Sequence, residues 1–386
     1  MKGWLNNLSK KQIILLLSII LFSVFIIIAG ELLTPKKATL ELSDFSYKKS
    51  IKYNADKLGV TGKNLAKELG LDISVSKNKP INQLGVSQEV FEHSIEHLLG
   101  HKDATIKYYI YFVLFIFAFF YLINLGKPEK LDNKYYRKKY PRAVYNIVLI
   151  ITVITTGFLL GKSPNPMESG VKVFKTMVGL YPDPINKVMA FIFFIILSVI
   201  GNKLICGWAC PFGALQELFY SVPIFNKIKK VKLPFILTNS IRITIFIIML
   251  LFLFGIIGDK KGLVIYHYIN PFNLFNLDFD YPTILAVVVI SLVGGLIIYR
   301  PFCNFICPFG LISWIFERVS IFKVRVNFDL CNKCNACVKA CPTEAMKGII
   351  ENKKIYADCF SCGRCLNVCA KNAIDYRGSF IINKKN

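Results

Sequence analysis

Histidine is scarce in this chain of 386 residues, which has only His93, His97, His101 and His267. None lies in the long apolar segments described below, which excludes a pair of histidine ligands for a haem inside a membrane. The sequence also lacks C-x-x-C-H, which excludes the attachment of a c-type haem. Acidic residues are few, 24 against 48 lysines and arginines, and the formal net charge is +24. No motif directs this charge to nucleic acid, so we assign it to membrane topology and lipid headgroups.

Cysteine, in contrast, is concentrated near the C-terminus, where eight of the twelve fall into two runs of C-x2-C-x2-C-x3-C. This spacing binds two 4Fe-4S clusters, and the fourth cysteine of each run ligates the other cluster. Zinc knuckles and a disulfide framework are the alternatives, but zinc sites separate two close pairs, and disulfide-dense domains belong to secreted proteins. We therefore expect an electron-carrying domain with two clusters. The first is expected on Cys331, Cys334, Cys337 and Cys369, and the second on Cys359, Cys362, Cys365 and Cys341.

The rest of the chain is apolar, since 54% of all residues are hydrophobic. Six stretches approach the ~20 apolar residues that cross a bilayer as a helix, a length over which a buried soluble helix rarely stays apolar. They are Ile13–Ala29, Ile106–Leu125, Ala143–Gly161, Lys187–Ile205, Ile236–Gly258 and Thr283–Tyr299. The predicted fold class is mainly α: a polytopic membrane protein with about six transmembrane helices.

Lysine and arginine concentrate in residues 2–11, 127–142 and 227–232. The excess of positive charge in cytoplasmic loops therefore predicts that these segments, and both termini, are cytoplasmic. Free thiolates and clusters suit that reducing compartment. No small-residue cleavage site follows the first apolar stretch, so we expect it to remain as an anchor.

Residues 31–105 are polar and contain an internal duplication. Leu58-Gly-Val-Thr61 recurs as Leu84-Gly-Val-Ser87, and each copy leads into a helical pattern. Thr61 and Ser87 are predicted N-caps, with the hydrophobic pattern that staples a helix start. We expect a small extracytoplasmic helical module.

The other four cysteines form two copies of a second motif, C-x3-C-P-F-G. Each copy follows a predicted span, so the region 143–318 is expected to be a pair of repeated hairpins. The motif cysteines are Cys206, Cys210, Cys303 and Cys307. A pseudo-twofold packing of the repeats would gather them at the cytoplasmic membrane face. Three uses are open besides that of ordinary buried thiols: a third iron–sulfur cluster, a soft metal such as copper, or redox dithiols.

Two C-x3-C-P motifs followed by a two-cluster module resemble the membrane-bound polyferredoxins of the NapH, NosR and CcoG type. The resemblance covers about residues 143–378. It implies a bacterial inner-membrane protein with two 4Fe-4S clusters and a candidate third metal centre. Its partners would be membrane lipid, a respiratory or assembly redox protein and a candidate quinol donor. No covalent-flavin attachment sequence of the Ser/Thr-Gly-Ala-Thr type is found.

Five segments follow from these patterns: an anchor (1–30), the extracytoplasmic module (31–105), the second span with a basic loop (106–142), the repeated hairpins (143–318) and a ferredoxin-like α+β domain (319–386). The favoured function is electron transfer between a membrane donor and a partner redox protein, as a subunit rather than a stand-alone oxidoreductase. The alternative is a metal-handling reductase or assembly factor for a respiratory metalloenzyme that uses the C-x3-C-P thiols.

Overall fold

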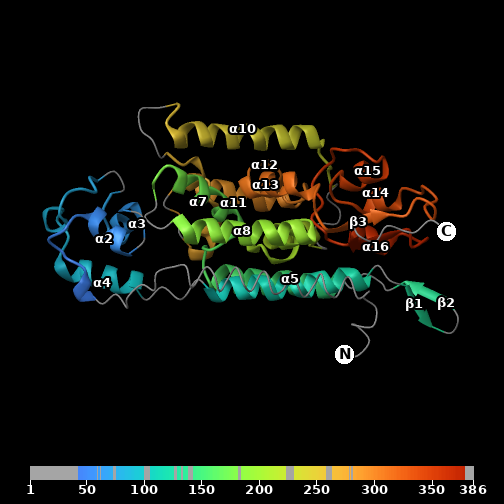
Figure 1. Cartoon of the computed structure of the whole chain (residues 1–386), viewed down its shortest axis with the longest axis horizontal. Coiled ribbons are helices and arrows are strands. Elements are labelled where there is room, and N and C mark those ends of the chain that lie inside the picture. The colour runs from blue at the N-terminus through green and yellow to red at the C-terminus, as the bar shows by residue number, and fades with distance from the viewer. Residues whose placement is uncertain are drawn as a thin grey trace.

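Three parts follow one another along the long axis of the molecule: a helical module, a bundle of apolar helices and a cysteine-rich domain (Figure 1). The module and the cysteine-rich domain lie at opposite ends of the bundle. This computed structural model describes residues 42–58, 60, 62–72, 75–99, 105–125, 128–131, 134–137, 142–180, 184–222, 230–257, 263–277, 279 and 281–378. The predicted anchor Ile13–Ala29 lies outside these residues.

The module has its own hydrophobic core, separate from that of the bundle. Its elements are η2 (Leu42–Asp44), α2 (Ile51–Leu58), α3 (Gly62–Glu68), η3 (Ile81–Gln83) and α4 (Gln88–Leu99). The predicted cap at Ser87 is confirmed, because its hydroxyl accepts a hydrogen bond from the amide of Val90 at 3.3 Å. Val86 and Phe91, the predicted staple, are both buried.

Among the described residues, three helices are long and apolar enough to cross a membrane: Ile106–Leu125 in α5 (Thr105–Leu125), α8 (Pro184–Gly201) and α10 (Phe235–Phe254). Two shorter apolar helices run beside them. One is α6 (Arg142–Thr152), which continues as the π-helix η4 (Val153–Leu159), and the other is α11 (Pro282–Gly295). Large apolar side chains such as Val113, Ile247 and Ile290 are exposed on the outside of the bundle, as lipid contact requires.

Two predicted spans end earlier than the sequence indicates. The predicted Lys187–Ile205 stops at Gly201, because Asn202 and Lys203 take left-handed φ angles of 52° and 60° and reverse the chain. The predicted Thr283–Tyr299 stops at Gly295, and Arg300 turns the chain at a φ of 45°.

Shorter elements connect these helices. They are the antiparallel strands β1 (Pro128–Leu131) and β2 (Lys134–Arg137), then α7 (Pro166–Met177), η7 (Ile265–His267) and η8 (Pro271–Asn276). The amide of Phe235, which begins α10, donates to Glu344 of the cysteine-rich domain at 2.9 Å. Because α10 starts at that domain, η7 and η8, which follow it, lie toward the other end of the bundle.

The cysteine-rich domain is built on one antiparallel strand pair, β3 (Phe322–Val326) and β4 (Ile374–Gly378), in which Val324 lies opposite Tyr376. Its helices are α14 (Ala336–Ala340), α15 (Ala345–Ile350) and α16 (Arg364–Val368). The domain shares one continuous core with the bundle. The ring of Phe322 packs edge-on against that of Phe119 in α5, with 4.7 Å between the centroids.

Candidate iron–sulfur sites

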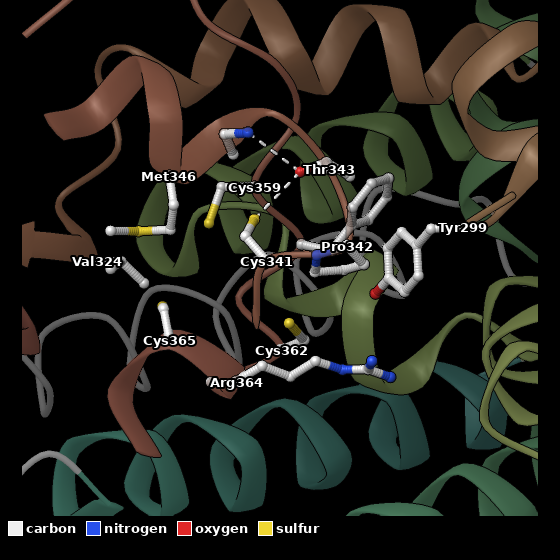
Figure 2. A pocket seen from close by; sticks show the side chains of 13 residues that line it. Tyr299, Val324, Cys341, Pro342, Thr343, Met346, Cys359, Cys362, Arg364 and Cys365 are labelled. Atoms are coloured by element: carbon white, nitrogen blue, oxygen red, sulfur yellow. Dashed lines mark hydrogen bonds between the residues drawn. The ribbon is translucent and has the colours of Figure 1, made fainter. Parts of the chain in front are cut away.

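The inner quartet of cysteines lines a small pocket on the side of the domain that faces the bundle. Its members are Cys341, Cys359, Cys362 and Cys365, and Figure 2 shows their sulfur atoms around one space. Three come from the second run and one from the first, which is the crossed grouping that the spacing predicts. The loop between Cys359 and Cys365 is shaped by left-handed backbone at Ser361 and Gly363.

The outer quartet lines a second small pocket. Its members are Cys331, Cys334, Cys337 and Cys369. Left-handed backbone at Lys333 and Asn335 shapes this ligand loop. Cys334 is exposed, so the outer quartet faces solvent, whereas the inner quartet faces the bundle.

Burial raises the pKa of Cys362 to about 11 despite the opposing charge of Arg364. The pKa values of Cys359 and Cys365 rise further for the same reason. Such thiols lose their protons on binding a metal centre. Within the described residues, no three cysteine, histidine or carboxylate side chains are arranged around a single metal ion. Each quartet instead surrounds a space, and four thiol donors around a cavity fit a 4Fe-4S cluster.

The first C-x3-C-P motif lies on a re-entrant hairpin. After the turn at Lys203 the chain runs back into the bundle as the π-helix η5 (Ile205–Ala209), and Cys210 forms the tip. Pro211 then begins α9 (Pro211–Ser221). This helix returns to the cysteine-rich domain, where Glu217 pairs with Arg364.

Contacts with α6 and η4 show how deep this hairpin reaches. Three hydroxyls donate to three successive carbonyls of η5: Tyr145 to Gly207 (3.2 Å), Thr152 to Trp208 (2.8 Å) and Thr156 to Ala209 (3.3 Å). Tyr145 and Thr156 are eleven residues apart, which is about 16 Å along a helix. Gly157, the next residue, lies between Pro211 and Phe275 of η8. Cys210 therefore sits well inside the bundle.

The second motif repeats this arrangement. After the turn at Arg300, α12 (Pro301–Phe305) enters the bundle, Cys307 forms the tip and α13 (Pro308–Glu317) returns. In Figure 1, α12 and α13 lie in the middle of the bundle, between α10 and α8. At the tip, the Tyr266 hydroxyl of η7 donates to the carbonyl of Ile306 at 2.8 Å. At the other end of α13, Glu317 accepts from the amide of Cys359 at 3.2 Å.

The two hairpins meet, and the first contributes a polar side chain to the first cysteine of the second. Gln216 donates to the sulfur of Cys303 at 3.5 Å. Ser313 holds the same place in the second repeat, and its hydroxyl donates to the carbonyl of Gly310 at 3.2 Å.

We call Cys206, Cys210, Cys303 and Cys307 the four-thiol site. The motif cysteines lie on re-entrant hairpins rather than at the ends of the spans, and their position at the cytoplasmic membrane face stays a prediction. Each span reverses before the motif, which carries the thiols inward.

The four-thiol site and the inner quartet are in direct backbone contact. The carbonyl of Phe360 approaches Gly207 so closely that a Cβ at this glycine would lie 2.1 Å from the oxygen. Next to it, the indole of Trp208 donates to the carbonyl of Ser361 at 3.1 Å. On the side of the inner quartet, Phe360 is directly bonded to Cys359 and Ser361 to Cys362, so both contacts adjoin a cysteine of the quartet.

Buried charges surround this contact. Asp358 pairs with Lys203 and Arg242, and Glu217 pairs with Arg300 at 3.1 Å. No role was assigned to these buried cations from the sequence. A sequence pattern points to two of them, because Lys203 and Arg300 each stand three residues before the first cysteine of their motif.

Comparison with known proteins agrees with this chemistry. A family profile described as a 4Fe-4S binding domain matches residues 188–232 and 280–327, and a second profile with that description matches residues 324–347. The ferredoxin-type protein NapH of Haemophilus influenzae is 24% identical over 210 residues, which are 52% of this chain and 70% of NapH. The regulatory protein NosR of Stutzerimonas stutzeri is 31% identical over 155 residues, 38% of this chain and 21% of NosR.

This chain is therefore similar to the 4Fe-4S ferredoxin-like membrane proteins of the NapH and NosR type. An uncharacterized protein of Methanocaldococcus jannaschii is also similar, 28% identical over 62% of this chain and 86% of its own length. No solved structure matches. The two segments matched by the first 4Fe-4S binding profile contain the cysteines of the four-thiol site, whereas the cysteines of the two quartets lie outside them.

Replacing Gly207 with alanine should displace the Phe360 loop, because the new methyl group has no room beside the carbonyl oxygen. We expect a loss of about 1–3 kcal/mol or more in stability and loss of iron from the inner quartet. Thermal unfolding and iron content of the purified protein measure both effects. Gly294→Ala is the control, since its Cβ would meet only Pro301 at 3.6 Å. Wild-type values for Gly207→Ala would refute the contact.

Proposed function

We propose that this protein passes electrons between a membrane donor, with quinol as the candidate, and a partner redox protein through two cytoplasmic 4Fe-4S clusters. The observation that carries the proposal is the gathering of the eight C-terminal cysteines into two quartets around two cavities. A 4Fe-4S cluster in each cavity would supply one-electron transfer without proton or substrate chemistry. This supports an electron-transfer subunit.

The two quartets differ in their exposure to solvent, so we propose different roles for them in electron transfer. The outer quartet, with Cys334 exposed, is where a soluble redox protein can approach. The inner quartet is shielded by β3, by α15 and by the bundle. Lysines 333 and 371 line the outer cavity, which favours a partner with an acidic surface.

The proposed topology has six spans, with both termini in the cytoplasm and the 31–105 module outside. Its support is the placement of the module and the cysteine-rich domain at opposite ends of helices long enough to span a bilayer (Figure 1).

For the four-thiol site we propose a third iron–sulfur centre, ligated by Cys206, Cys210, Cys303 and Cys307. The match of a 4Fe-4S binding profile to both hairpins supports a cluster over the metal-handling alternative. The contact of Gly207 with Phe360 supports electronic contact between this centre and the inner quartet.

Iron content and a matched pair of variants test the quartets. Two cubes alone require about eight irons per chain and a third centre requires more. Cys341→Ser should damage the cluster of the inner cavity and Cys369→Ser that of the outer cavity, because each cysteine lines the cavity opposite to its own run. Electron paramagnetic resonance of the reduced, anaerobically purified variants separates the two signals. Damage to the cluster of the same run would contradict the crossed ligation.

Topology is tested by labelling with a membrane-impermeant thiol reagent in intact cells. Ser76→Cys, at an exposed position of the module, should react. Lys353→Cys, on the exposed side of the cysteine-rich domain, is the control and should react only after lysis. The reverse pattern would overturn the proposed orientation.

A measurement of electron flow distinguishes a third iron–sulfur centre from the metal-handling function. Cys206→Ser and Cys307→Ser should abolish electron transfer from a membrane donor, while dithionite still reduces both ferredoxin-type clusters in the same variants. Electron flow at the wild-type rate would favour the metal-handling function instead. Kinetic absorbance spectroscopy on proteoliposomes with reduced quinol as donor makes the measurement.

A further inference from the structure

Three buried cations face the four-thiol site. Arg300 donates to the carbonyls of Cys206 and, at 2.7 Å, Gly207. Arg242 donates to the carbonyl of Cys303 at 3.2 Å. Lys203, the third, donates from Nζ to the carbonyl of Gly310 at 3.0 Å. All three side chains are fully buried, and charged groups are rarely placed so without a partner of opposite charge.

Two of these cations are related by the repeat, and each reaches across it. Lys203 belongs to the first copy and contacts Gly310 of the second. Arg300 belongs to the second copy and approaches Gly213 of the first, where a Cβ would lie 3.0 Å from its Nη1. Both residues turn the chain with positive φ. The Pro-Phe-Gly turn of each motif is therefore covered by the cation of the other copy.

The ion pairs around the site do not balance. Asp358 is shared by Lys203 and Arg242, and Glu217 is shared by Arg300 and Arg364. Four cations thus share two carboxylates. A third buried carboxyl, Glu317, accepts from the amide of Cys359, and even with it the four cations outnumber the carboxylates. Excess positive charge in an apolar interior is costly, and the four thiols are the groups beside it that become negative when they bind iron.

We infer that Lys203, Arg242 and Arg300 are the counter-charges of the centre at the four-thiol site and raise its reduction potential. The inference rests on the third centre of the proposed function. Reduction adds one negative charge, which a nearby fixed cation stabilises in a medium of low dielectric constant. The two arginines keep their charge at any physiological pH, which suits a permanent counter-charge.

The test is a redox titration of the full-length, anaerobically purified protein, followed by electron paramagnetic resonance. Arg300→Gln removes the charge but keeps a hydrogen-bond donor near Cys206. We expect the equilibrium constant for reduction of the third centre to fall at least tenfold, a shift of about 59 mV to lower potential. Arg300→Lys should recover most of the shift. Lys203→Gln is the second variant and should lower the potential in the same direction.

Arg318→Gln is the control for loss of charge, because Arg318 is exposed just beyond α13. Iron content and thermal unfolding are recorded for each variant. Unchanged potentials of the third centre in Arg300→Gln and Lys203→Gln, with iron retained, would assign these cations to domain attachment alone and overturn the inference. A wild-type protein without a centre at the four thiols would overturn it too, but the signals of the two quartets would leave the two-cluster function standing. Loss of those signals in wild type would count against the proposed function itself.

Discussion

The close approach of the Phe360 carbonyl to Gly207 is the contact on which the arrangement of the redox sites depends. It joins the ligand loop of the inner quartet to the first re-entrant hairpin, with no side chain between the two backbones. Trp208 reinforces the contact through its hydrogen bond to Ser361. Because both partners are backbone segments next to cysteines, a shift of either one moves a quartet and the four-thiol site relative to each other.

Buried ion pairs hold this contact on both sides. Asp358, next to Cys359, pairs with cations of the bundle, and Glu217 of the bundle pairs with Arg364, next to Cys365. Desolvation offsets much of the attraction in such pairs, but removing one partner typically costs about 3–5 kcal/mol because a buried charge remains. The pairs therefore fix one orientation of the domain on the bundle more than they add stability.

Sequence predicted the local features well. The grouping of cysteines in two cavities follows from spacing, since a run of C-x2-C-x2-C-x3-C leaves its fourth thiol on the far side of its own loop. The helix cap at Ser87 could be predicted because the cap and the hydrophobic staple involve only residues within four positions of it. Apolar composition likewise located α5, α8 and α10.

The re-entrant hairpins escaped prediction because hydropathy records how apolar a segment is and not which way it runs. The reversal at Lys203 depends on two left-handed residues and on partners far along the chain, Gly310 and Asp358. The burial of Arg300 escaped prediction for the same reason, since its ion-pair partner Glu217 lies in the other repeat. Contacts of this kind arise only when the two copies pack together.

The course of the hairpins would tie the proposed third centre to the electrical state of the membrane. An elementary charge that crosses the whole bilayer gains or loses about 2.3 kcal/mol per 100 mV. The first hairpin runs from the turn at Lys203 to Pro211, which lies beside Gly157 of η4. An electron on a third centre between these points would cross part of the membrane field. On that proposal, the transmembrane voltage would bias the occupancy of the site by electrons.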